Sequence, residues 1–134
     1  MSNTLHDVPG DHVDQIPIES VAAATATGYV SQWTAPFDCY VQTVKLAFSV
    51  AITGADTETK HYNLDDNDIS TELANTDFVS GTDAAAGTVS AFYAPTDPGK
   101  SLAAGDSLYL EVEKVGSTSL LFPRGNMIVR YRGR

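Results

Sequence analysis

Apolar and polar residues alternate along much of this sequence with a period of two, which is the pattern of a half-buried β-strand. The longest run spans residues 44–52, where Val44, Leu46, Phe48, Val50 and Ile52 alternate with polar or small residues. The same alternation appears over 108–113 and again over 127–132. In the first of these, leucine and valine alternate with tyrosine and glutamate, so one side of the strand is predicted to be buried and the other acidic and exposed.

One break in this alternation predicts a local irregularity. Cys39 and Val41 fall on the opposite phase to Val44 and Leu46, although all four are apolar. A shift by one residue turns every side chain to the other face of a sheet, and a β-bulge is the usual way to absorb it. We therefore expect a bulge near Gln42.

Turn sequences rich in glycine, proline, asparagine and aspartate separate the runs, for example at 53–56, 95–99, 116–119 and 123–126. No segment shows a convincing helical period. Roughly seven or eight short strands with such turns predict an all-β fold, an antiparallel β-sandwich or jelly roll. The 134 residues are enough for one domain with a real core.

Residues 1–20 differ from the rest of the chain. They contain two prolines and four acidic residues, and their apolar residues are too scattered to define a face. Proline fixes φ and removes a backbone donor, so we expect an extended N-terminal arm at 1–20 and a β-sandwich domain at 21–134. The arm is either a frayed terminus or a segment that becomes ordered on a partner. Neither a secretory signal nor a membrane-spanning stretch is expected.

Charge is unevenly distributed along this acidic chain, which has a formal net charge of −9. Residues 54–83 hold eight acids and a single base, whereas the last eleven residues hold four arginines and no acid. The excess of acid makes direct nucleic-acid binding a poor prediction. The arginine strip is either a solvated surface or a surface that meets the acidic side of a neighbouring copy.

Candidate chemistry is sparse, and we expect no catalytic residues, no metal site, no cofactor and no enzymatic activity. His6 and His12 lie in the predicted arm, and His61 lies alone on a predicted strand. Cys39 is the single cysteine and is expected to be a buried apolar side chain. The acidic run at 65–68 lacks the spacing of a calcium-binding EF-hand loop, so a solvated loop is favoured over a cation site.

Several segments of strand and turn share a pattern with a known class of proteins: WTAPFDCYV at 33–41, VKLAF at 44–48, AITGADT at 51–57, DFVSGTDAA at 77–85, AGDSL at 104–108, EKVG at 113–116 and VRY at 129–131. Over roughly residues 25–132 the chain resembles small β-sandwich proteins from the structural modules of tailed bacteriophages. The resemblance implies a virion protein of the capsid decoration, or cement, type. Such a protein binds the major capsid protein on the capsid exterior, is often a homotrimer, and stabilises the shell.

The expected role suggests where contacts would lie: the arm by analogy with such proteins, and self-association from aromatic residues and the arginine strip. Capsid contacts are expected from apolar residues of the arm: Leu5, Val8, Val13, Ile16 and Ile18. Self-association is expected from Trp33, Phe37, Tyr40, Arg124, Arg130 and Arg132, with the alternative that most of the aromatic residues belong to the core. The alternative function is a receptor- or glycan-binding module of a head or tail fibre.

Overall fold

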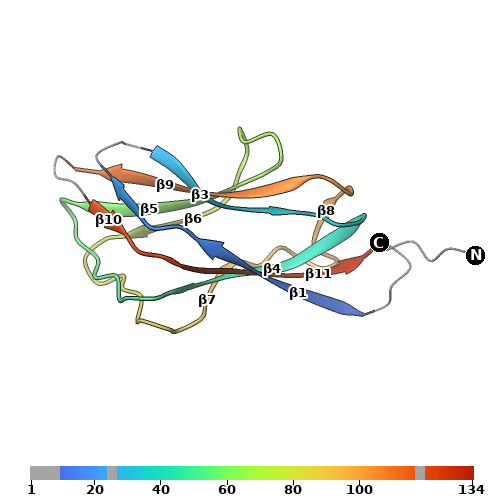
Figure 1. Ribbon diagram of the computed structural model, residues 1–134, viewed down its shortest axis with the longest axis horizontal. Coiled ribbons are helices and arrows are strands. Elements are labelled where there is room, and N and C mark those ends of the chain that lie inside the picture. Colours follow the sequence, from blue (N-terminus) through green and yellow to red (C-terminus); the bar gives the residue numbers. More distant parts are fainter. Residues whose placement is uncertain (1–9, 24–26, 117–119) are drawn as a thin grey trace, which may run out of the picture.

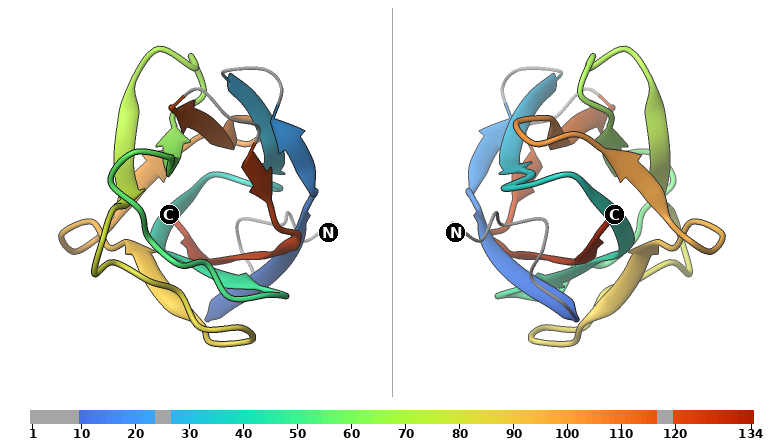
Figure 2. Two further views of the ribbon diagram at one scale, coloured as in Figure 1. Left: turned by 90° about the vertical axis from the view of Figure 1, so that its left-hand side faces the viewer. Right: turned by 90° about the vertical axis from the view of Figure 1, so that its right-hand side faces the viewer.

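Residues 10–23, 27–116 and 120–134 are described by the computed structural model, and every regular element within them is a β-strand. Eleven strands form two larger antiparallel sheets and one small two-stranded sheet. The end-on views in Figure 2 show the two larger sheets facing each other, and the buried hydrophobic residues form one core cluster. No helix in these ranges is long and apolar enough to cross a membrane.

The strands divide between the sheets as follows. A five-stranded sheet contains β1 (Asp11–Ile18), β11 (Gly125–Gly133), β4 (Cys39–Phe48), β7 (Ser90–Tyr93) and β8 (Lys100–Leu102). A four-stranded sheet contains, in order, β3 (Thr27–Thr34), β9 (Ser107–Val115), β5 (Thr59–Asp65) and β6 (Glu72–Phe78). The small sheet pairs β2 (Val21–Ala23) with β10 (Leu120–Phe122). Since β2, β8 and β10 have three residues each, the eleven strands include eight longer ones, in line with the number predicted.

The pairing of the strands defines the topology. The chain forms a nested antiparallel hairpin in which β1 pairs with β11, β2 with β10, β3 with β9, β4 with β8 and β5 with β6. Further pairings of β4 with β11 and of β5 with β9 roll this hairpin into two layers (Figure 1). This is the strand arrangement of a jelly roll, so the predicted fold class is confirmed.

The core forms between the two sheets from the apolar phase of each strand. Leu108, Leu110 and Val112 of β9 are buried, and so are Met127, Val129 and Tyr131 of β11. At one end of the core Tyr62 makes edge-to-face contacts with Phe78 and Phe122, with ring centroids 5.8 and 5.6 Å apart. The alternation that was read from the sequence over 108–113 and 127–132 therefore describes the buried faces of these strands.

The expected irregularity near Gln42 is confirmed. In the ladder between β11 and β4, Arg130 pairs with Thr43 and Tyr131 pairs with Val41, so Gln42 is the additional residue of a bulge. The bulge allows Val41 and Val44 to be buried together, although they are three residues apart.

Residues 11–18 are extended, as the sequence predicted for the arm, and they form β1 along the full length of β11. Residues 1–9 lie outside the described residues. Along β1 every second residue, from His12 to Ile18, points inward and is more buried than its neighbours. This phase was not visible in the sequence because it includes Asp14, whose Oδ2 accepts hydrogen bonds from Trp33 Nε1 (2.8 Å) and the Tyr131 hydroxyl (2.9 Å).

Candidate binding surfaces

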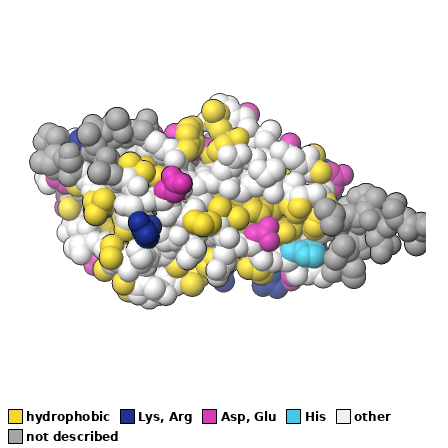
Figure 3. All heavy atoms as spheres, viewed as in Figure 1, with side chains coloured by type: hydrophobic (Ala, Val, Ile, Leu, Met, Phe, Trp, Pro, Cys, Tyr) yellow, Lys and Arg dark blue, Asp and Glu magenta, His cyan; other side chains and the backbone are white. Residues whose placement is uncertain are grey.

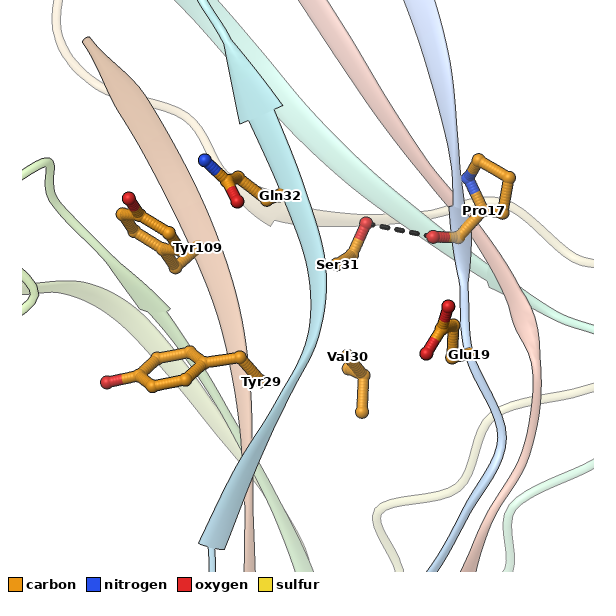
Figure 4. Close-up of a pocket in the computed structure, with 7 residues that line it drawn as sticks. All are labelled: Pro17, Glu19, Tyr29, Val30, Ser31, Gln32 and Tyr109. Carbon is orange, nitrogen blue, oxygen red and sulfur yellow. Dashed lines mark hydrogen bonds between the residues drawn. The ribbon is translucent and has the colours of Figure 1, made fainter.

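The first candidate surface is the seam where the two sheets meet along their edge strands. β1 lies at the edge of the five-stranded sheet and β3 lies at the edge of the four-stranded sheet. Besides the bond from Trp33 Nε1 to Asp14, two hydrogen bonds cross the seam near the end of β1. The Glu19 N–H donates to the Val30 carbonyl (3.0 Å), and the Ser31 hydroxyl donates to the Pro17 carbonyl (3.0 Å; Figure 4). The two strands do not form a ladder with each other, so β1 and β3 are edge strands of their sheets in the described part of the chain.

A groove of about 510 Å³ lies at this seam. It is lined by Pro17, Glu19, Tyr29, Val30, Ser31, Gln32 and Tyr109. Figure 4 shows the side chains of Tyr29 and Tyr109 on one side of β3 and Glu19 on the other. In the space-filling view, hydrophobic side chains gather in a band along the seam (Figure 3). A second hollow of about 380 Å³ shares Pro17 and Glu19 with the groove and extends to Arg124.

Two tyrosines give the groove its chemical character. Tyr29 is 49% exposed, and its ring lies against that of Tyr109 at a centroid distance of 5.7 Å in an edge-to-face arrangement. Partial desolvation, and then the neighbouring Glu111 carboxylate, raise the pKa of the Tyr29 phenol, so it remains a neutral hydrogen-bonding group. Exposed tyrosines of this kind combine an apolar ring with a polar tip and are typical of binding surfaces.

The second candidate surface is the outward face of the four-stranded sheet, which we call the acidic face. The register places five carboxylates on it: Asp65, Glu72, Asp77, Glu111 and Glu113. His61 lies between two of them, with Nδ1 bonded to Asp77 and Nε2 3.5 Å from Glu113. Asn63 donates from Nδ2 to Glu111 Oε1 at 3.1 Å. No Lys or Arg occupies an outward position of the described strands of this sheet.

Crowding on the acidic face is concentrated at Asp65. Its side chain is 5% exposed, and burial raises its pKa to about 6, with further contributions from Glu111, Glu72 and Glu113. A carboxylate that is desolvated among others of the same charge is costly to ionise. The acidic face thus carries unbalanced negative charge.

The third candidate surface is the outward face of the five-stranded sheet, which we call the basic face. It carries Lys45 of β4 together with Arg130 and Arg132 of β11. Arg130 forms an ion pair with Asp11 of β1, and Arg132 lies 3.9 Å from Asp97. Lys45 is exposed and lies beside Ile128 in the register.

The predicted arm contacts occupy different environments in the structure. Leu5 and Val8 lie outside the described residues. Val13 is 58% exposed on the basic face, next to Arg130 in the register. Ile16 is partly buried against the core, and Ile18 is a core residue with 2% exposure. Val13 is therefore the described arm residue whose side chain is most available to a partner.

The predicted self-association residues also separate into two groups. Trp33 and Phe37 are buried in the core of this chain, where both rings pack against Tyr131. Tyr40 is half-buried, Arg124 is exposed, and Arg130 and Arg132 retain roughly half of their side-chain exposure. The arginines are thus available to a second copy, whereas the rings of Trp33 and Phe37 are enclosed.

The acidic run at 65–68 bonds mainly within the chain. Asp66 forms an ion pair with Lys100 at 2.8 Å, and Asp68 accepts hydrogen bonds from the backbone N–H groups of Ser70 and Thr71. Asn67 Oδ1 accepts from the Ser107 N–H. Within the described part of the chain, no group of three or more His, Cys, Asp or Glu residues is placed to hold a metal ion.

The sequence analysis did not single out the residues of the groove. Tyr109 carried a signal, because it is an aromatic residue on the acidic, outward phase of its strand. The exposure of Tyr29 had no such signal, since a bulge in β3 at Val30 puts Tyr29 outside and Trp33 inside.

Comparisons with known proteins add the following. No protein-family model matches this sequence, and no match is found among curated proteins. Similar solved structures come from infectious bursal disease virus. The chain from the Gx strain has a TM-score of 0.45 and 12% identity, and a mutant VP2 protein in derived T=1 particles has a TM-score of 0.47 and 13% identity. Each match covers 92% of this chain and 32% of the other, so this chain spans about a third of their length.

Proposed function

We propose that this protein is a non-catalytic structural component of a virus particle, a capsid decoration protein that binds the major capsid protein on the exterior of the shell. The resemblance of its strand and turn segments to structural modules of tailed bacteriophages supports this class. The observation that carries the proposal is the seam between β1 and β3, where two sheet edges, an apolar band and a groove come together.

The seam fits an extended segment of a partner protein. A segment laid along the edge of β1 or β3 would gain backbone hydrogen bonds, and its side chains would enter the groove beside Tyr29 and Tyr109. Capsid proteins offer such segments where subunits meet. Val13, together with Leu5 and Val8 of the predicted arm, would extend this contact along the capsid.

Stabilisation of the shell follows from mass action. A protein that binds across a subunit boundary lowers the free energy of the assembled shell and leaves that of separated subunits unchanged. At a hundredfold excess over the dissociation constant, each site contributes about 2.7 kcal/mol. A homotrimer would engage three such sites together, which raises the overall affinity further.

The proposal is tested by adding the purified protein to capsids that lack it and measuring the temperature at which the capsids rupture. We expect the wild-type protein to raise that temperature and Tyr29→Asp to lose most of the effect. Val89→Asp is the matched control, because Val89 is also half-exposed but precedes β7, at the opposite edge of the five-stranded sheet. If wild-type protein binds without changing the rupture temperature, the cement role is wrong.

A deletion of residues 1–9 tests the predicted arm separately, because it leaves β1 and Ile18 in place. We expect weaker capsid binding with an unchanged urea unfolding transition. Unchanged capsid affinity would remove Leu5 and Val8 from the proposed contact.

The tyrosine pair in the groove also favours a second candidate, a receptor- or glycan-binding module, because exposed tyrosines can pack against a sugar ring and hydrogen-bond its hydroxyls. A glycan array distinguishes the two functions. Specific glycan binding that is lost in Tyr29→Ser, without any effect of the protein on capsids, would favour the module.

A further inference from the structure

We propose that copies of this protein associate head to tail, with the acidic face of one copy against the basic face of the next. The two faces lie on opposite sides of the jelly roll, because each is the outward side of a different sheet. The association itself is argued from the charges of the two faces. Its role in joining neighbouring copies on a capsid rests on the proposed function.

Charge complementarity between the faces identifies a second copy as the occupant. Five carboxylates lie on the acidic face, without an outward Lys or Arg on its described strands. Of the eight Lys and Arg residues of the chain, five lie on β4, on β11 or immediately beside β11: Lys45, Arg124, Arg130, Arg132 and Arg134. Complementary potentials of this kind mainly set register and choice of partner.

Existing contacts leave charge on both faces for such a partner. On the acidic face His61 contacts Asp77 and Glu113. Glu72 accepts a hydrogen bond from Asn75 and forms no ion pair with the described residues. On the basic face Asp11 pairs with Arg130, and Lys45 is exposed. Among the described residues, Arg132 lies 3.9 Å from the Asp97 carboxylate, and its Nε lies 3.3 Å from the amide of the neutral Gln42. Glu72 and Glu113 on one copy would therefore face Lys45 and Arg132 on the next.

The contact joins two different surfaces and is heterologous, so repetition of it closes a ring or continues as a filament. Four strands at a spacing of about 4.8 Å and a length of about 23 Å give a face on the order of 400 Å². Stable complexes bury about 800 Å² on each partner, so a single contact is weak. Ring closure, or the high local concentration of copies on a shell, would strengthen it.

Charge-reversal variants test the inference in pairs. The first variant carries Lys45→Glu and Arg132→Glu on the basic face, and the second carries Glu72→Lys and Glu113→Lys on the acidic face. Lys60→Glu with Lys114→Glu is the matched control. It changes the net charge by the same amount as the first variant does. Lys60 and Lys114 lie at the ends of β5 and β9, at positions that do not point out from the acidic face.

The measurement is the weight-average mass by sedimentation from 10 µM to 1 mM protein at moderate salt. We expect the wild type and the control to gain mass with concentration, and each reversal variant alone to associate about tenfold more weakly. An equimolar mixture of the two variants should regain the wild-type association, because each acidic face then meets a basic one.

Urea unfolding of each variant establishes that it is folded, and the single changes Lys45→Glu and Glu113→Lys provide a milder pair. A wild type that stays monomeric to 1 mM, or a mixture of folded variants that associates no better than either alone, would overturn the inference. The two proposals remain separable because Lys45 lies on the other sheet from Tyr29 and Tyr109. Lys45→Glu should therefore weaken self-association and leave the groove, and with it the effect on capsid rupture, in place.

Discussion

Replacement of Asp65 by asparagine should make the protein more stable at neutral pH, although it removes a charged group from a folded protein. Asp65 is 5% exposed and lies among Glu72, Glu111 and Glu113, and its pKa rises from an ordinary value of 3.8 to about 6. Asparagine has nearly the same shape and cannot ionise. The substitution therefore removes the cost of the charge and retains the packing.

The magnitude follows from the pKa. Between pH 4 and 6 the folded protein holds a proton on Asp65 that the unfolded chain has released, so stability falls as pH rises through this window. Each pH unit between the two pKa values corresponds to about 1.4 kcal/mol, which gives a cost of at most about 3 kcal/mol at pH 7. Wild type and Asp65→Asn should therefore be equally stable near pH 4 and differ most above pH 6.

The assay is urea unfolding of both proteins from pH 4 to pH 7.5. Asp68→Asn is a control of opposite sign, because backbone hydrogen bonds from Ser70 and Thr71 lower the pKa of Asp68. That variant should be less stable than wild type across this whole range, because the pKa of Asp68 lies below 3.8 and the carboxylate stays ionised. A difference between wild type and Asp65→Asn that does not change with pH would refute the reasoning.

Three further predictions concern the core. Asp14→Ala should cost about 2–5 kcal/mol in urea unfolding, because it leaves the Trp33 Nε1–H and the Tyr131 hydroxyl buried without an acceptor. Tyr62→Phe should be neutral or stabilising by up to about 1 kcal/mol, since the buried Tyr62 hydroxyl has no hydrogen-bond partner among the described residues; a loss above about 1 kcal/mol would contradict this. Cys39 is buried with a pKa of about 11, so a thiol reagent at pH 8 should label it only after unfolding.

The packing of the N-terminal strand β1 could not be predicted from the sequence. Asp14 occupies the inward phase of β1, and its hydrogen-bond donors come from β3 and β11. No local pattern can reveal an acceptor whose partners lie that far along the chain, so the sequence predicts only an arm with scattered apolar residues where β1 lies. A carboxylate on the inward side of an edge strand is tolerable only where tertiary contacts satisfy it.

The sequence by itself determined the all-β class, the buried phases of β9 and β11 and the bulge at Gln42, because alternation and its breaks are local consequences of strand geometry. It also indicated the separation of acidic and basic residues along the chain. Only the tertiary structure decided that these charges lie on opposite sheets and that β1 and β3 leave a groove between them. Those features depend on which strands pair, and pairing between distant strands is set by how the whole chain packs.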